Sequence, residues 1–229
     1  METNINFAVV IPWRRKYDRA YAYEIVSNWY KNNFPSAKIF SVDDGKEPFC
    51  LSGCRNLGVR QAEEERYKVV VINDADTIPE VDPLIKAVSL AMTNNAVYLP
   101  YTEYHSLMHI GTTDYLNGKP LNECRCLVVP GACSGVYVTS PKTWWKHYGQ
   151  DERFRGWGFE DAAWWSAHTT LLGREPVRVE GNVYSFHHDS EKKRGKQYEA
   201  NATLCAHYHA AQNDIERMKV LAAAGLGVD

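Results

Sequence analysis

Short apolar runs typical of buried strands alternate with helical patterns through the first hundred residues of this 229-residue chain. We expect strands at 6–11, 38–42, 69–73 and 96–99, and helices at 18–32, 51–65 and 82–93. A βαβαβαβ order of this kind predicts a doubly wound, mostly parallel sheet flanked by helices. Ligands of such sheets bind beyond the carboxyl ends of the strands. The residues that follow each strand are therefore the first candidates for a site.

Two aspartates end the third of these runs, VVVINDADTIP at 69–79. Side chains two residues apart in a strand point to the same side, so Asp74 and Asp76 are expected to face one site. Two carboxylates make a hard, oxygen-rich site suited to Mg²⁺ or Mn²⁺, usually to a metal that also carries phosphates. The alternative interpretation is an Asp-rich turn that closes a buried strand.

The composition excludes some classes of protein. The chain is 45% hydrophobic with a formal net charge of -2, which suffices for one substantial core and gives no global electrostatic case for a nucleic-acid or membrane partner. No apolar run approaches the ~20 residues that span a bilayer. The first residues lack a signal peptide's basic region and cleavage site, so we expect a cytoplasmic protein. The spacing of the six cysteines does not match the usual zinc sites and indicates reduced thiols.

Beyond residue 100 the pattern is less regular. We expect a polar binding loop at 101–123, two short strands within 127–138, helices at 140–147 and 162–172, a strand at 177–186 and a terminal helix at 198–224. Five of the seven tryptophans lie between 144 and 165, around the segment FRGWGFED at 154–161. Aromatic rings beside carboxylates are a common sugar-binding combination. The alternative is an aromatic core followed by a helix with an acidic first turn, which Trp157 between two glycines fits poorly.

Six motifs in order, VVIPWRR, SVDDG, CRNLG, DAD, FRGWGFED and FHHDSEKK, resemble those of the GT-A-fold glycosyltransferases. The likeness is greatest to the β-1,4-galactosyltransferase and chondroitin-polymerase type, with its WG-x-ED motif, and covers about residues 7–196. It implies an α/β GT-A (Rossmann-like) fold with a mixed, mainly parallel sheet flanked by helices. It also implies one domain over 1–229, made of a nucleotide-sugar-binding half (1–100), an acceptor and catalytic half (101–196) and a C-terminal helix (197–229).

The resemblance assigns a metal site that holds Mn²⁺ or Mg²⁺. Asp76 is the expected metal ligand, with Asp74 nearer the ribose or a metal-bound water. A late histidine completes the protein ligands, and it is His187 or His188 because neighbours in a strand point to opposite faces; the pattern favours His188. The galactosyltransferases add a methionine ligand where Ser185 stands in this chain.

Donor and acceptor residues also follow from the resemblance. Donor contacts are expected from Pro12, Arg14, Arg15, Asp43 or Asp44, Arg55, Asn56 and Asp74. Asp161 corresponds to the catalytic base, while Glu160, Trp157 and Gly158 are expected to bind the acceptor. One carboxylate base that deprotonates the acceptor, with a metal beside the departing diphosphate, fits an inverting mechanism.

The expected function is transfer of a hexose from a nucleoside-diphosphate sugar, most consistent with a UDP-sugar, to an acceptor hydroxyl. The acceptor is a glycan, a protein or a hydroxylated base in DNA, in a bacterial or phage-infected cell. Two alternatives remain. A sugar nucleotidyltransferase usually has a Gly-rich loop near the N-terminus, and VVIPWRRKYD has no glycine. A non-catalytic nucleotide- or carbohydrate-binding module is the other, although every candidate catalytic position is filled.

Overall fold

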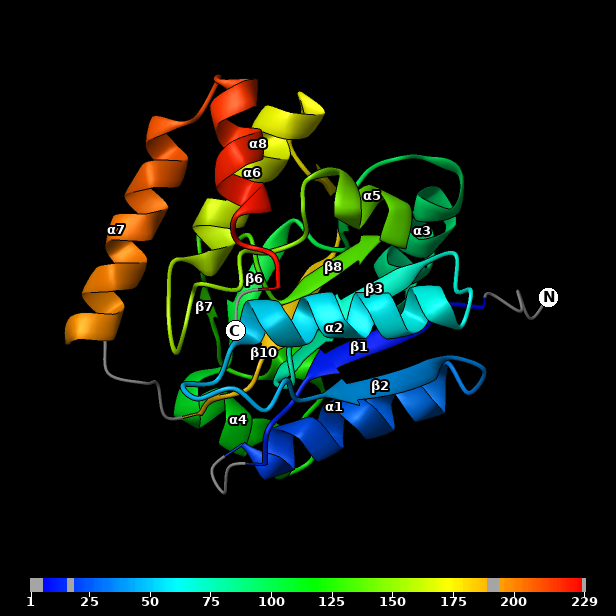
Figure 1. The fold of residues 1–229 in the computed structure, drawn as a ribbon. Helices are drawn as coiled ribbons and strands as arrows, with labels where there is room; N and C mark the ends of the chain where they lie inside the picture. Colours follow the sequence, from blue (N-terminus) through cyan, green and yellow to red (C-terminus); the bar gives the residue numbers. More distant parts are fainter. Residues whose placement is uncertain (1–5, 16–18, 189–193, 228–229) are drawn as a thin grey trace.

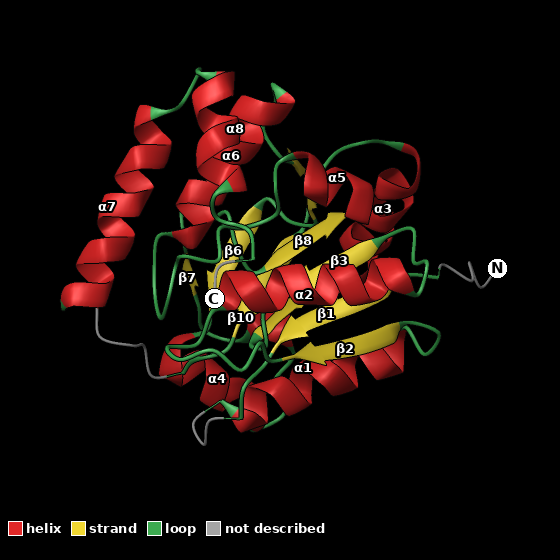
Figure 2. Cartoon of the chain, in the orientation of Figure 1, coloured by secondary structure: helices red, strands yellow, loops and turns green. Residues whose placement is uncertain are grey.

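The computed structural model describes residues 6–15, 19–188 and 194–227, and two β-sheets flanked by helices form its centre (Figures 1 and 2). Among these residues, the larger sheet has six strands in the order β2-β1-β3-β8-β5-β9. They are β1 (Ala8–Pro12), β2 (Lys38–Val42), β3 (Val70–Asn73), β5 (Tyr98–Leu99), β8 (Val136–Thr139) and β9 (Val177–Arg178). β1 is parallel to β2 and β3, whereas β8 is antiparallel to β3 and β5. The predicted fold class, a mixed sheet flanked by helices, is confirmed.

The apolar runs at the centre of this sheet are buried on both faces, as their continuous β-branched composition predicts. β2 and β3 lie on opposite sides of β1. Right-handed crossovers therefore place α1 (Ala20–Asn33) and α2 (Leu51–Glu64) on opposite faces of the sheet. Figure 1 shows α2 lying across β1 and β3. The carboxyl ends of β1, β2 and β3 consequently meet at one edge.

A smaller sheet continues from that edge. Its strands are β4 (Thr77–Pro79), β10 (Asn182–Ser185), β6 (Glu103–Ser106) and β7 (Leu127–Val128), in the order β4-β10-β6-β7. β10 is antiparallel to β4 and parallel to β6. Because β4 follows the two aspartates directly, this sheet brings residues from the last third of the chain to the end of β3.

The remaining helices are α3 (Val81–Thr93), α4 (Met108–Leu116), the 3₁₀ helix η1 (Leu121–Glu123), α5 (Pro141–Lys146), α6 (Glu160–Leu172), α7 (Lys196–Ala210) and α8 (Ile215–Ala223). Figure 1 shows α6, α7 and α8 grouped together, away from α1 and α2. They share a second hydrophobic cluster that includes Phe154, Ala163, Cys205, Tyr208 and Met218. No helix in the described ranges has both the length and the apolar character needed to cross a bilayer.

Several sequence predictions were wrong. The segment 101–123 is not a loop, because it forms β6, α4 and η1. The predicted terminal helix is two helices: the chain turns after α7, and the Asp214 side chain accepts a hydrogen bond from the Arg217 N–H (3.0 Å) to begin α8. The strand predicted at 177–186 is divided into β9 and β10.

Close packing of α2 on β1 leads to a stability prediction. A Cβ atom added at Gly58 of α2 would lie 2.2 Å from Val10 Cγ1, in the most buried part of the sheet. We expect Gly58→Ala to lower the free energy of unfolding by about 1–3 kcal/mol, because the overpacking outweighs the better helix propensity of alanine. Urea denaturation measures the change. Glu64→Ala, at the exposed end of the same helix, is the control and should change stability by less than about 0.5 kcal/mol.

Candidate functional site

A cavity of about 590 Å³ opens beside the carboxyl ends of β1 and β3. The segments that line it include Pro12, residues 74–76, residues 131–134, residues 156–162 and His188, together with Arg19, Phe49, Leu51, Tyr104, Val129 and Tyr198. Three separate sequence motifs, the DAD turn, the FRGWGFED segment and the late histidines, therefore meet in one cavity. The position agrees with the rule that ligands of such sheets bind beyond the strand ends.

Strand pairing brings Asp76 and His188 together. The chain reverses after β3, where the Thr77 N–H donates a hydrogen bond to the Asp74 carbonyl (3.2 Å). β4 then pairs with β10, with Ser185 opposite Thr77. Continuing that register brings His188 to the turn, and its Nε2 lies 2.9 Å from Asp76 Oδ2. Both residues line the cavity, so a carboxylate oxygen and an imidazole nitrogen are available there to a divalent cation.

The two adjacent histidines have different surroundings. The His187 N–H donates a hydrogen bond to Thr112 Oγ1 of α4 (2.8 Å), and the His187 ring lies 5.7 Å from the His109 ring, centroid to centroid. His187 is therefore directed toward α4, whereas His188 pairs with Asp76. Of the two alternatives that the sequence left open, His188 is the one whose ring contacts Asp76.

The two aspartates of the turn also differ. Burial raises the pKa of Asp74 to about 6, although the nearby Arg55 charge opposes the shift. Burial acts on Asp76 as well, but the hydrogen bond and charge of His188 outweigh it and lower the pKa of Asp76. Asp76 is thus the stronger acid, which suits a residue that holds a cation. Asp74 Oδ1 instead accepts a hydrogen bond from Arg55 Nη2 (2.7 Å).

Arg55, from α2, lies behind the cavity and joins its two sides. Its side chain is 0% exposed. Nη1 donates hydrogen bonds to Asp161 Oδ1 (2.8 Å) and Gln150 Oε1 (2.8 Å), while Nη2 holds Asp74. The Tyr137 hydroxyl of β8 donates a further hydrogen bond to Asp161 Oδ1 (2.5 Å), and the guanidinium lies 5.1 Å from the centre of the Tyr137 ring. The orientation of Asp161 is therefore determined by two donors.

Arg55 and Asn56 were expected to contact the donor, but the structure buries both away from the cavity. Asn56 Nδ2 donates to the Gln150 carbonyl (2.7 Å), and Asn56 Oδ1 accepts from Trp144 Nε1 (3.0 Å). These residues match the sequence motif, yet their hydrogen bonds are made within the protein. These hydrogen bonds hold the segment before α6 against α2.

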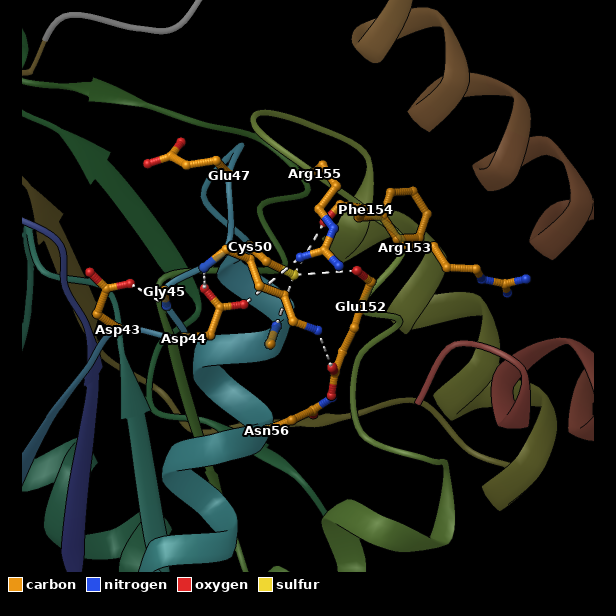
Figure 3. A network of polar contacts seen from close by, with 12 residues as sticks. Asp43, Asp44, Gly45, Glu47, Cys50, Asn56, Glu152, Arg153, Phe154 and Arg155 are labelled. Atoms are coloured by element: carbon orange, nitrogen blue, oxygen red, sulfur yellow. Dashed lines mark hydrogen bonds and ion pairs between the residues drawn. The ribbon is translucent and has the colours of Figure 1, made fainter. Parts of the chain in front are cut away.

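A second set of contacts fastens the segment before α6 to the start of α2 (Figure 3). The Cys50 thiol donates weakly to the carbonyl oxygens of Glu152 and Phe154, each at 3.4 Å. Asn56 Nδ2 also donates to Glu152 Oε1 (3.0 Å), and the Glu152 side chain is only 5% exposed. The Arg155 guanidinium reaches Asp44 at 3.9 Å. These contacts set the direction in which the chain enters the FRGWGFED segment.

The glycines of that segment permit an abrupt start to α6. Gly156 and Gly158 have φ values of +65° and +104°, which only glycine adopts without strain, and Phe159 follows at +76°. α7 supports the loop, since Asn201 Nδ2 donates to the carbonyl oxygens of Arg155 (2.9 Å) and Gly158 (3.3 Å). The Trp157 ring lies nearly parallel to a tyrosine ring of α7. The first two residues of α6, Glu160 and Asp161, thereby line the cavity.

Glu160 and Asp161 are adjacent carboxyl groups with different surroundings. Burial raises the pKa of Glu160 to about 8, and the negative charge of Asp161 adds to the shift. The raised pKa favours the protonated form of Glu160, which can donate a hydrogen bond. Asp161, by contrast, accepts hydrogen bonds from Arg55 and Tyr137. Glu160 is therefore suited to donate a hydrogen bond, whereas Asp161 accepts them. The sequence motif does not distinguish the two carboxyl groups in this way.

Most of the charged residues expected to bind the donor pair with one another at the ends of β1 and β2. Arg14 donates to both carboxylate oxygens of Asp43 (2.6 and 2.8 Å) and to Glu47 (2.7 Å). Arg15 is exposed, and neither arginine lines the cavity. Asp44 is nearly buried, with 7% of its side chain exposed. Of the residues expected at this end of the sheet, Pro12 reaches the cavity wall.

Asp43 and Asp44 form another candidate cation group with Cys54, whose ligand atoms all lie within 4.8 Å of one another. Arg14 already occupies both oxygens of Asp43. Burial raises the pKa of the Cys54 thiol, which disfavours the thiolate that binds metals. This group is therefore a poorer cation site than Asp76 with His188.

Sequence reasoning missed three contributors to the site. Arg19 lines the cavity at the start of α1, and its positive charge acts on Asp76. Tyr198 of α7 stacks with Trp157, with ring centroids 6.1 Å apart and planes 13° from parallel. Tyr137 reaches Asp161 from β8. These three residues lie inside predicted helices and strands, and nothing in the neighbouring sequence marks them as part of a site. They reach the site only because distant segments pack together.

No protein-family model and no curated protein matches the sequence. Solved structures do match it. The catalytic domain of Drosophila β1,4-galactosyltransferase 7, in complex with xylobiose, superposes with a TM-score of 0.57 at 14% identity, over 86% of this chain and 79% of that one. A mutant of the same enzyme, in complex with manganese, UDP-Gal and xylobiose, gives a TM-score of 0.56 at 14% identity and the same coverage.

A third match is GalNAc-T7 with UDP, GalNAc and Mn²⁺, with a TM-score of 0.54 at 11% identity. It covers 94% of this chain and 54% of GalNAc-T7, so the chain spans about half the length of that protein. At these identities the likeness concerns the fold. This chain has the GT-A fold of glycosyltransferase catalytic domains.

Proposed function

We propose that this protein is a metal-dependent glycosyltransferase that moves a sugar from a UDP-sugar to an acceptor hydroxyl with inversion at the anomeric carbon. One observation carries the proposal: the Asp76–His188 pair and the Glu160–Asp161 pair line the same cavity at the strand ends. A cation site and an acid–base pair within one cavity suit phosphate-linked group transfer. The structural neighbours were solved with manganese and UDP or UDP-Gal, which supports the same donor class.

Asp76 and His188 are the residues that we assign to Mn²⁺ or Mg²⁺. Their oxygen and nitrogen donors fit a divalent cation that keeps its other positions for water and phosphate oxygens. A cation held there supplies positive charge beside the departing diphosphate. Arg19, on the same cavity wall, adds a guanidinium suited to phosphate oxygens. In this proposal the leaving group binds between two sources of positive charge.

Asp161 is the proposed base. Arg55 and Tyr137 both donate to Oδ1, so we assign Oδ2 to the acceptor hydroxyl. Holding one oxygen with two donors fixes the direction of the other, which general-base catalysis requires. Glu160, whose pKa is raised by burial, is proposed to donate a hydrogen bond to an acceptor oxygen in its protonated form. In this proposal Asp161 is the base and Glu160 binds the acceptor.

The acceptor binds, in this proposal, against the parallel rings of Trp157 and Tyr198. Such rings cover the apolar C–H face of a sugar while the carboxyl groups bind its hydroxyls. The Gly158 backbone allows close approach at the same wall. A sugar hydroxyl, on a glycan or on a glycosylated protein or base, is thus the acceptor class that the cavity suits.

Turnover tests the proposal directly. The protein is incubated with Mn²⁺ and, in turn, UDP-glucose, UDP-galactose, UDP-GlcNAc and UDP-GalNAc. We expect one of these donors to release UDP. Xylosides or other sugar acceptors should increase the rate of release, and EDTA should stop it. Asp161→Asn should lower this rate by about 10²–10⁴-fold, because the base is lost. Its affinity for UDP, measured by calorimetry with Mn²⁺, should change little. An Asp161→Asn protein that binds UDP and turns over at the wild-type rate contradicts the assigned base.

The cation site predicts a difference between neighbouring histidines. With Mn²⁺ and UDP at about 100 times Kd, the wild-type protein should gain about 2.7 kcal/mol of stability, seen as a rise in Tm. Asp76→Asn and His188→Gln should abolish the Mn²⁺-dependent part of this rise. His187→Gln is the matched control and should retain it, since His187 lies toward α4. Equal losses from both histidine variants would argue against the assigned ligand.

Two arginines that are close in the sequence, Arg15 and Arg19, provide a test of phosphate binding. Arg19→Ala should weaken UDP binding by roughly tenfold to a hundredfold, the range expected for loss of charge-assisted hydrogen bonds worth about 1.5–3 kcal/mol. Arg15→Ala, an exposed residue outside the cavity wall, should bind UDP as the wild type does. Uridine, which lacks phosphates, should bind both variants equally. If Arg15→Ala shows the greater loss, the phosphate contact belongs to the arginine expected from sequence.

A further inference from the structure

Three side chains of the smaller sheet form a chain of contacts outside the cavity. Cys126 Sγ lies 3.1 Å from His105 Nδ1, and His105 Nε2 lies 3.0 Å from Glu103 Oε2. A thiol, an imidazole and a carboxylate in this order constitute a nucleophile, its base and the group that orients the base. We name these residues the Cys126 triad. The proposed glycosyl transfer makes no use of them.

The arrangement follows from strand geometry. Glu103 and His105 alternate along β6 and share one face of the sheet, opposite to Tyr104, which lines the cavity. β7 pairs antiparallel with β6, with Ser106 opposite Leu127. Cys126 directly precedes β7 and is thereby brought beside His105. The triad thus lies on the face of the sheet that is turned away from the cavity.

Three neighbouring side chains orient the imidazole ring of His105. Tyr184 of β10 is opposite His105, and the two rings lie 5.2 Å apart, centroid to centroid. The side chain of His105 is only 15% exposed, whereas that of Glu103 is 57% exposed. Packing between Tyr184 and Cys126, with Glu103 at the far nitrogen, restricts the rotation of the imidazole. A restricted imidazole keeps its Nδ1 directed at the sulfur.

The contacts determine which nitrogen can receive a proton. A carboxylate can only accept a hydrogen bond, so Nε2 of His105 carries the hydrogen and donates it to Glu103. In the neutral imidazole, Nδ1 is then an acceptor, and it faces the Cys126 thiol. The S–H group therefore donates to His105, which is the arrangement that removes a thiol proton as the sulfur attacks.

The other five cysteines lack the complete arrangement, and all six lie in the described part of the chain as free thiols. Cys205 also contacts an imidazole, with its Sγ 3.7 Å from His209 Nε2, but that thiol is buried. Cys126 is exposed, whereas the others are buried or half-buried. Burial raises the pKa of Cys50 to about 11 and that of Cys133 to about 12. It also raises the pKa of Cys54, Cys124 and Cys205. These thiols are both less accessible and less acidic than ordinary ones, so they serve as internal controls.

We propose that Cys126 is a nucleophilic thiol that exchanges with low-molecular-weight disulfides, through general-base assistance from His105. The sulfur attacks one sulfur of the disulfide R–S–S–R and forms a Cys126–S–S–R bond, while the R–S–S–R bond breaks and R–S⁻ leaves. The thiol proton passes to His105 Nδ1 and then to the departing R–S⁻. The products are a mixed disulfide and one R–SH, with no other oxidant or reductant consumed.

The experiment treats the reduced full-length protein with glutathione disulfide at pH 7 and follows the added mass of one glutathione by intact-protein and peptide mass spectrometry. We expect the first adduct at Cys126. His105→Asn should lower the rate constant for that adduct by about tenfold or more, because the base is removed. Glu103→Gln, a conservative change on an exposed side chain, should lower it by a smaller factor. Cys205→Ser, which removes a buried thiol of α7 outside the cavity wall, should leave it unchanged.

Several outcomes would overturn the proposal: a first adduct at another cysteine, or equal Cys126 rates in the wild type and in both triad variants. Urea denaturation of each variant excludes loss of folding as the cause, and Glu103→Gln keeps the test valid if His105→Asn does not fold. UDP release is measured in parallel. A reactive Cys126 in a protein without transferase activity would uphold this inference while the proposed function fails, so the two are separable.

Discussion

The buried guanidinium of Arg55 is the interaction around which the candidate site is organised. A charge removed from water costs several kcal/mol unless it is paired and hydrogen-bonded. Arg55 is fully buried, and Asp74, Asp161 and Gln150 supply its partners. This requirement ties the turn after β3 to the first residues of α6, although they are far apart in the chain. A residue that never reaches the cavity thereby determines where two cavity carboxylates lie.

The two sheets contribute differently to the site. Parallel strands β1 and β3, buried on both faces, provide a rigid edge and end there together. The smaller sheet is attached at that edge through β4, and its pairing with β10 carries His188 to Asp76. Tyr104 of β6 lines the cavity from one face of the smaller sheet, while the Cys126 triad lies on the other. One short sheet thus supplies both a candidate cation ligand and a separate thiol site.

Prediction succeeded where the signal was local. The run at 69–73 became β3 with Asp74 and Asp76 just beyond it, and the helix at 51–65 became α2. It failed where the outcome depended on distant partners. Arg55 was expected at the donor from its motif, but a motif does not indicate where a side chain points. In the structure the Arg55 side chain is buried and pairs with Asp161 and Asp74. The segment 101–123 lacks strong periodicity, yet pairing of β6 with β10 and β7 made it ordered.

The sequence by itself determined the alternation of strands and helices, the carboxylates at the end of β3 and the acidic start of the helix after FRGWGFED. These depend on β-branched runs, turn residues and glycines, whose preferences act within a few residues. Only the tertiary structure decided that His188 rather than His187 meets Asp76, that burial raises the pKa of Glu160 beside Asp161, and that Cys126 meets His105. Those outcomes depend on strand register and burial, which arise when distant segments pack together.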